Sequence, residues 1–212
     1  MKTLLSVAVF SFIAYGLAPA QTFEVSVLAG YPRISGAPLG TINSENGKDD
    51  DSKLKGNYSY GATLTINTPG YYGHELSYIN NRATFQTKLR TGTGGSTVTL
   101  EQDKIVIQQA FYNFLIYFMP KGERFRPFVT GGLQMYQYGE PHVAEWPGGG
   151  GRSYGANYGG GLKIKLFKHA LVRFDFRDCI GGKPYDLTFE DVTHSGGWFR
   201  QLQASFGIAI GF

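Results

Sequence analysis

The sequence predicts an all-β protein, an eight-stranded antiparallel up-and-down barrel. Three observations predict this fold: eight segments alternate apolar and polar residues, the connections between them alternate in length, and the composition suits β structure. Of the 212 residues, 30 are Gly, 15% are aromatic and 17% are charged, whereas typical soluble domains contain about 25% charged residues. The length corresponds to one domain of ordinary size.

The first twenty residues, "MKTLLSVAVFSFIAYGLAPA", have the features of a secretory signal peptide. One lysine precedes an apolar run, and Ala18-Pro19-Ala20 supplies the small residues of a cleavage site. Cleavage after Ala20 divides the chain into a signal peptide, 1–20, and a mature domain, 21–212. The alternative is an uncleaved membrane anchor, but the apolar run is shorter than the roughly 20 residues that span a bilayer.

Eight segments carry the period-two pattern of a strand with one apolar face. The last segment shows it most clearly, because Phe206, Ile208 and Ile210 alternate with glycine, alanine and serine. Two segments, 105–118 and 125–138, are apolar on both faces, so the sequence predicts strands there without fixing which face points inward. In chain order the eight segments are 23–30, 58–66, 71–79, 105–118, 125–138, 161–167, 170–178 and 201–212.

The other six segments place small, polar or charged residues on the face opposite the apolar one. Leu28 is an apolar exception on that face of the first segment. From the first segment to the last, the residues on this face include Glu24 and Ser26, Ser59 and Thr63, Glu75 and Ser77, Lys163 and Lys165, Arg173, Asp175 and Arg177, and Ser205 and Gly207.

The connections alternate between long and short along the chain. Short turns are expected near 67–70, 120–124 and 168–170, and long polar or glycine-rich loops near 32–53, 80–104, 139–152 and 181–196. This alternation is typical of an up-and-down membrane barrel whose two chain ends lie on the short-turn side.

The apolar face is interpreted as facing lipid and the polar face as lining the lumen. A closed barrel leaves no strand edge unpaired in hydrocarbon, and side chains fill the interior of a narrow eight-stranded barrel. We interpret the inward charges as a structural plug of paired charges; the alternative is a path for protons or solutes. The predicted lumen charges are Glu24, Glu75, Lys163, Lys165, Arg173, Asp175 and Arg177.

The end of the chain carries the most specific motif. Ser205, Gly207, Ile210 and Phe212 occupy the polar, glycine, hydrophobic and terminal aromatic positions of the β-signal that the barrel-assembly machinery recognises. With "FRPFVTGGL" and "NYGGGLKIKLF" as softer matches, the mature chain resembles the small bacterial outer-membrane barrels of the OmpA/OmpX superfamily.

This resemblance implies an outer-membrane location in a Gram-negative bacterium. It also implies contact with outer-membrane lipids and lipopolysaccharide, and handling by periplasmic chaperones and the barrel-assembly machinery. OmpA proper carries a peptidoglycan-binding domain after its barrel, whereas this sequence stops at Phe212, so tethering to the cell wall is not implied.

Some barrels of this size modify lipid A as acyltransferases or deacylases. The corresponding candidates here are His194 and Ser195, with Glu190 or Asp191 nearby, and His142. Side chains of adjacent residues on a strand point apart, whereas a catalytic base must reach its nucleophile. We therefore expect no catalytic residues.

Other chemistries find little support in the sequence. The acidic run at 45–53 lacks the spacing of a calcium loop, and no metal or other cofactor is expected. Cys179 is the one cysteine, so no intramolecular disulfide is possible, and we expect it to be a buried small residue. A net charge of +4 with scattered Lys and Arg argues against nucleic-acid binding.

The sequence therefore predicts a monomeric outer-membrane barrel with a structural or surface-interaction role through four long extracellular loops. A lipid A-modifying enzyme and a narrow channel are the alternatives.

Overall fold

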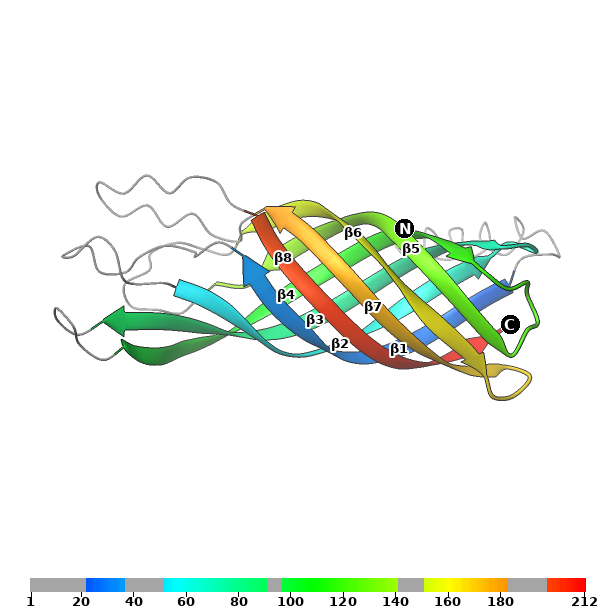
Figure 1. Ribbon diagram of the computed structural model, residues 1–212, viewed down its shortest axis with the longest axis horizontal. Helices are drawn as coiled ribbons and strands as arrows, with labels where there is room; N and C mark the ends of the chain where they lie inside the picture. Colours follow the sequence, from blue (N-terminus) through cyan, green and yellow to red (C-terminus); the bar gives the residue numbers. More distant parts are fainter. Residues whose placement is uncertain (1–21, 37–51, 91–96, 141–150, 183–197) are drawn as a thin grey trace, which may run out of the picture.

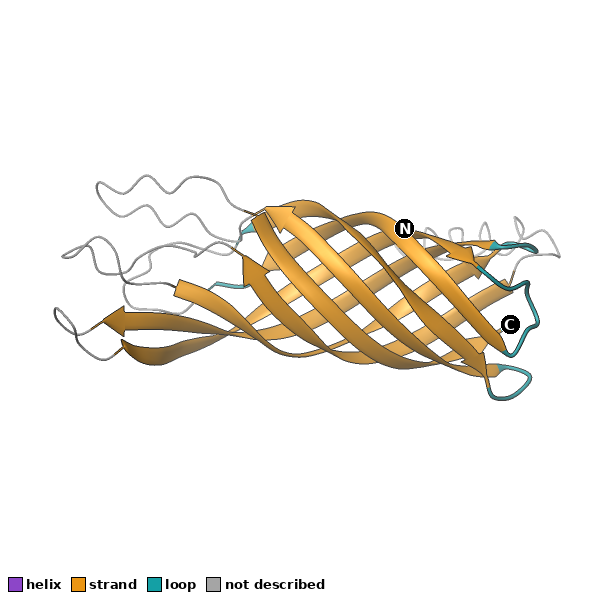
Figure 2. Ribbon diagram, in the orientation of Figure 1, coloured by secondary structure: helices purple, strands orange, loops and turns teal. Residues whose placement is uncertain are grey.

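The computed structural model describes residues 22–36, 52–90, 97–140, 151–182 and 198–212. The regular structure in these residues is entirely β-strand, and eight strands close into one antiparallel barrel in chain order (Figures 1 and 2). The predicted fold class is confirmed. The strands are β1 (Thr22–Gly36), β2 (Ser52–Asn67), β3 (Tyr72–Arg90), β4 (Thr97–Tyr117), β5 (Phe125–Tyr138), β6 (Arg152–Lys165), β7 (Ala170–Gly182) and β8 (Trp198–Gly211).

The first and last strands close the barrel. β1 pairs with β8 in continuous antiparallel register from Glu24 opposite Gly211 to Gly36 opposite Phe199. Each strand is therefore paired on both sides, which satisfies the backbone groups that hydrocarbon cannot. The described part of the chain holds no helix with the length and apolarity that a bilayer crossing requires.

The two ends of the barrel differ. Three short connections, 68–71, 118–124 and 166–169, lie at one end, which we call the turn end. The chain terminus is at this end too, because the Phe212 amide donates to the Phe23 carbonyl at 2.8 Å. We call the opposite end, where the four other connections attach, the loop end (Figure 1). The predicted up-and-down arrangement is confirmed.

The strands β3 and β4 are longer than the sequence indicated. Their pairing continues as far as Arg90 opposite Thr97, with a register shift between Phe85 and Gln86. The predicted loop at 80–104 is therefore wrong in its bounds, since most of it is a hairpin that projects beyond the other strands at the loop end (Figure 1). The backbone hydrogen bonds of an antiparallel pair do not depend on side-chain type, so the pairing continues where the sequence lacks a regular apolar alternation.

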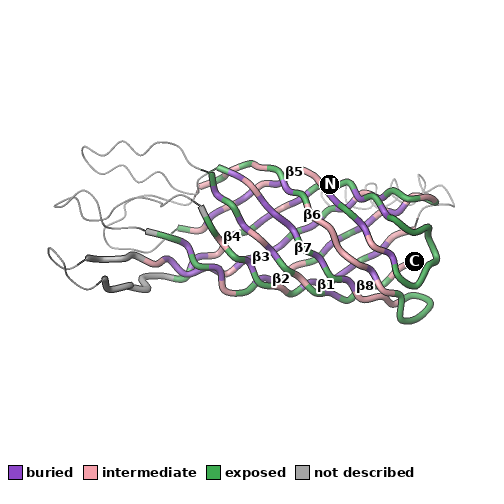
Figure 3. Tube along the Cα trace, in the orientation of Figure 1, coloured by how far each residue is buried: buried purple, intermediate pink, exposed green. Residues whose placement is uncertain are grey.

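Buried and exposed residues alternate along the strands of the barrel (Figure 3). The exposed positions carry large apolar side chains: Val27 is 68% exposed, Leu133 69% and Ile208 60%. Soluble monomers rarely expose contiguous apolar patches larger than a few hundred Å². The outer wall is thus a belt suited to lipid, as the alternation predicted.

The structure also establishes the facing of β4 and β5. Both strands place apolar and polar side chains in the lumen, which is why their sequences were apolar on both faces. The inward residues of β4 are Ile105, Ile107, Gln109, Phe111, Asn113, Leu115 and Tyr117. Those of β5 include Arg126, Phe128, Thr130, Gln134, Tyr136 and Tyr138.

The lumen is apolar toward the loop end. A buried group that we call the loop-end cluster draws residues from seven of the eight strands. Cys179 belongs to it and is 0% exposed, so the expectation of a buried small residue is confirmed. The cluster comprises Leu28, Leu54, Ile79, Ala83, Phe85, Ile105, Ile107, Phe111, Tyr136, Tyr138, Cys179 and Phe199.

Candidate functional site

Two arginines and two carboxylates meet inside the barrel at mid-height, and we call these four residues, Glu75, Arg173, Asp175 and Arg177, the lumen network. Arg173 donates to Asp175 through Nε and Nη2, at 2.7 and 2.6 Å. Its Nη1 donates to Glu75 Oε2 at 2.7 Å. Arg177 Nη2 lies 2.5 Å from Glu75 Oε1 and 3.2 Å from Asp175 Oδ1. The formal charges of the four residues cancel.

The network crosses the lumen. Glu75 is on β3 and the other three residues are on β7. In a closed ring of eight strands taken in order, these two strands lie on opposite walls. Arg173 and Glu75 are both 0% exposed, so their ion pair occupies the middle of the barrel and is shielded from water.

Neutral side chains complete the hydrogen bonds of the network. Thr65 donates to Glu75 Oε2 at 3.1 Å and Ser77 donates to Oε1 at 3.3 Å. With its amide nitrogen directed at Asn157 Oδ1, 2.9 Å away, Asn113 accepts from Arg177 Nη1 at 2.5 Å. A buried ion pair stabilises a fold only when its remaining donors and acceptors are satisfied in this way. The arrangement is that of a fixed, paired plug.

A second polar level lies toward the turn end. Lys163 forms an ion pair with Glu24 and donates to the Tyr117 hydroxyl at 3.0 Å. Asn67 donates to the other oxygen of Glu24 at 2.8 Å. Arg126, whose guanidinium carbon lies 3.5 Å from the Tyr117 ring centroid, joins this level. Arg126 and Tyr117 were not predicted from the sequence, because the facing of their strands was left open; the alternation of apolar and polar residues around Arg126 was the available signal.

A third polar level lies on the loop-end side of the lumen network, where Phe111 of the loop-end cluster also lies beside Arg177. Gln109 on β4 and Gln201 on β8 exchange amide hydrogen bonds of 3.1 and 3.3 Å. These strands also lie on opposite walls, so the lumen is crossed a second time. Asn81 donates to Gln109 at 2.7 Å, and Gln203 donates to Ser205 at 3.3 Å.

Lys165 lies elsewhere than expected. It was predicted to be a lumen charge together with Lys163, but it is the last residue of β6 and is exposed at the turn end. The alternation places it on the inward side, yet the strand ends there and the side chain extends into the opening. The predicted lumen charges that remain are three bases and three acids.

The four residues of the predicted assembly signal lie along β8 and just beyond it. Ile210 and Phe212 are exposed, the latter by 72%, whereas Ser205 and Gly207 face inward. Gly207 has a packing reason of its own: an added Cβ would lie 2.3 Å from Leu28 Cδ2 and 2.6 Å from the Val27 carbonyl oxygen. Only glycine fits there.

Several other sequence candidates lie outside the described residues. These are the signal-cleavage residues Ala18 and Ala20, the acidic residues 45–51, and the enzyme candidates His142, Glu190, Asp191, His194 and Ser195. His74 lies within the described residues and faces outward. Its Nδ1 lies 3.0 Å from the Tyr112 hydroxyl, and its ring stacks on that of Tyr112.

The barrel has the fold of the small bacterial outer-membrane proteins. It is similar to the outer membrane protein OprG of Pseudomonas aeruginosa, with a TM-score of 0.64, 13% identity, and coverage of 91% of this chain and 96% of that one. Neisserial surface protein A is similar with a TM-score of 0.56 and 12% identity, and the match covers 90% of this chain and 97% of that one. The outer membrane protein AlkL has a TM-score of 0.55 and 14% identity, and the match covers 92% of this chain and 93% of that one. No protein-family model and no curated protein sequence matches the chain.

Proposed function

We propose that this protein is an integral protein of the bacterial outer membrane with a structural or surface-interaction role, and that its loop end faces the cell exterior. The observation that carries this proposal is the inversion of the barrel: the outer wall is apolar and exposed, and the interior is polar, buried and paired. A lipid bilayer is the environment that suits this distribution.

Side chains fill the lumen at several heights, which argues against a channel. The lumen network and the Gln109–Gln201 pair each join opposite walls, and the loop-end cluster fills the lumen above them. A solute crossing the barrel would have to break buried ion pairs and displace packed aromatic rings. Interaction through the loop end, and not transport, is therefore the proposed role.

The outer wall offers a position for an anionic outer-leaflet lipid. Arg33 on β1 and Arg200 on β8 face outward near the loop end, in adjoining rows, because Arg33 is opposite Leu202 and Ser35 is opposite Arg200. Arg200 donates to the Asp178 carboxylate through Nε and Nη2, the latter at 2.5 Å. The Nη1 of Arg200 is left for another acceptor. We propose that lipopolysaccharide phosphates contact these arginines, since arginine donors match phosphate oxygens.

The closing strand is proposed to be the assembly signal. Ser205, Gly207, Ile210 and Phe212 would be recognised by the barrel-assembly machinery after periplasmic chaperones deliver the chain, and the folded barrel would be a monomer. The exposure of Phe212 at the turn end is consistent with recognition, because the ring contributes little to the interior.

Cell fractionation with detergent gels tests the proposal. We expect the protein in the outer-membrane fraction, with unheated and boiled samples migrating differently. Recovery from the soluble periplasm would overturn it. For the enzymatic alternative, mass spectrometry of lipid A from cells with and without the protein is expected to show no difference; a change lost in His194→Ala or Ser195→Ala would establish catalysis.

A further inference from the structure

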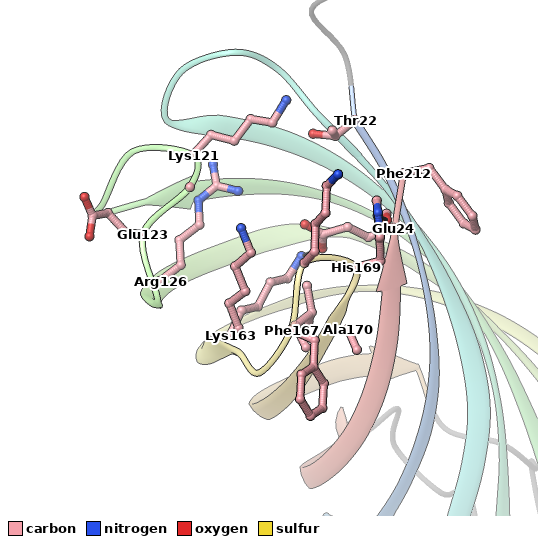
Figure 4. A pocket seen from close by; sticks show the side chains of 15 residues that line it. Thr22, Glu24, Lys121, Glu123, Arg126, Lys163, Phe167, His169, Ala170 and Phe212 are labelled. Atoms are coloured by element: carbon pink, nitrogen blue, oxygen red, sulfur yellow. Dashed lines mark hydrogen bonds and ion pairs between the residues drawn. The ribbon is translucent and has the colours of Figure 1, made fainter.

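The barrel opens at the turn end into a cavity with a volume of 320 Å³, which we call the turn-end mouth (Figure 4). Its lining comes from the β4–β5 turn, the β6–β7 turn, the turn-end residues of β1, β5, β6, β7 and β8, and Phe212. Among the residues of the lining, five are Lys or Arg and two are Glu. The cations are Lys121, Arg126, Lys163, Lys165 and Lys168.

The inner wall of this mouth is fixed. Lys163 is held by Glu24 and Tyr117, as described above. Arg126 is 6% exposed and donates to the carbonyls of Met119 and Gly70 at 3.3 and 3.2 Å. Carbonyl oxygens satisfy its hydrogen bonds without neutralising its charge. Arg126 therefore joins two turns and leaves a positive charge at the inner wall of the mouth.

The outer rim carries three further cations, Lys121, Lys165 and Lys168. All three are exposed, and none forms an ion pair with another described residue. The carboxylate on the same turn, Glu123, points away from the opening in Figure 4, whereas Lys121, Arg126 and Lys163 gather around it. The mouth thus concentrates positive charge from separate segments: five cations line it, against Glu123, the terminal carboxylate of Phe212 and Glu24, which pairs with Lys163.

We propose that the turn-end mouth binds a phosphate group. Lysine ammonium groups arranged around a cavity present several donors to one tetrahedral anion, and charge-assisted hydrogen bonds of this kind are the strong ones. The cavity lies at the lower end of the range for small-molecule sites, roughly 300–1,000 Å³. This site is independent of any role of the loop end.

The phosphate has two chemically equivalent sources. It can belong to a soluble ion or ester, or to the headgroup of an anionic phospholipid in the adjacent leaflet. Phe167 and Phe212 border the mouth and are each 72% exposed, as aromatic rings at a lipid–water boundary are. Both sources offer the same oxygen atoms to the lysines.

The test uses the folded protein in nanodiscs of phosphatidylcholine. Calorimetric titration with inorganic phosphate and with glycerol phosphate measures the soluble source. A second set of nanodiscs containing phosphatidylglycerol, monitored by ³¹P NMR, measures the headgroup source. The variant is Lys165→Gln/Lys168→Gln, and the matched control is Lys104→Gln/Arg152→Gln, which removes two exposed cations toward the loop end.

We expect wild-type protein to bind in at least one arm. The affinity should be about tenfold weaker in the lysine variant, because two charged donors are lost. It should be unchanged in the control. Binding in the calorimetric arm alone identifies a soluble phosphate, and binding in the NMR arm alone identifies the lipid headgroup. Absence of binding in both arms, or an equal loss in the control, overturns the proposal. Heat-dependent migration on gels verifies that each variant is folded.

Discussion

Arg173 on β7 donates to Glu75 on β3 at 2.7 Å, although the two strands lie on opposite walls of the barrel. The two residues are 98 positions apart in the sequence, and Arg177 bonds to the same carboxylate across 102 positions. Because both side chains are fully buried, the contact ties the two walls together and closes the space between them.

Removing Arg173 should destabilise the barrel strongly. Arg173→Ala leaves Glu75 and Asp175 buried with only Arg177 to compensate them, and loss of one partner of a buried ion pair costs about 3–5 kcal/mol. Urea unfolding in detergent or lipid vesicles measures the free energy of unfolding. Lys165→Ala, at the exposed end of β6, is the control and should leave it unchanged. Equal stability of wild type and Arg173→Ala would refute the structural plug.

A large loss is also expected in the loop-end cluster. Phe199 is 4% exposed and packs edge-on against Tyr136 and Tyr138, at centroid distances of 5.8 and 5.6 Å. Phe199→Ala should cost about 3–5 kcal/mol, because the surrounding rings cannot collapse into the cavity.

The control for this change is Phe176→Ala on the outer wall, where the ring is 55% exposed and acyl chains can fill the vacated space. It should cost clearly less in the same unfolding assay. A larger loss for Phe176→Ala than for Phe199→Ala would mean that the outer wall, not the lumen, is the packed core.

Period-two alternation predicts the facing of a strand only where its two faces differ in chemistry. In β7 and β8 the alternation predicted the facing correctly, because one face meets lipid and the other is charged or small. In β4 and β5 the alternation could not predict the facing, since Ile105 and Ile107 are apolar residues that pack inside the lumen. Hydrophobicity alone does not distinguish a side chain that faces lipid from one that faces an apolar plug.

The partners of the inward charges and the lengths of β3 and β4 could not be predicted from the sequence alone. The pairing of Glu75 with Arg173 follows from barrel closure, which places β3 across from β7; the sequence indicated inward charges but not their partners. The length of β3 and β4 was underestimated because the residues before Arg90 and after Thr97 lack a clear apolar face, whereas cross-strand hydrogen bonding continues there.

Gly207 should be required for packing of the folded barrel, apart from any recognition by the assembly machinery. An added Cβ would collide with Leu28 and the Val27 carbonyl at distances below 3 Å, so Gly207→Ala should destabilise the barrel in detergent by about 1–3 kcal/mol. Gly211→Ala on the same strand is the matched control, because its nearest contact is 3.6 Å to Glu24 Cγ, and it should be neutral. Identical unfolding midpoints for the two variants would show that Gly207 is not sterically constrained.

Phe212 should act in cells more than in detergent. Phe212→Ala is expected to lower the amount of protein in the outer membrane while leaving refolding in detergent intact, since its ring is 72% exposed. Phe167→Ala removes an equally exposed ring at the same end and should leave the outer-membrane level unchanged. Quantitative immunoblots of membrane fractions compare the two. Normal levels of Phe212→Ala would contradict the proposed assembly signal.

Planar-bilayer recording tests the closed lumen most directly. Wild-type protein, shown to be folded by its heat-dependent migration, is incorporated beside Arg173→Ala. Both should give no stable unitary current: the wild type because the lumen network, the Gln109–Gln201 pair and the loop-end cluster all close the barrel, and Arg173→Ala because the last two remain. Stable unitary currents from the folded wild-type protein would contradict the closed lumen.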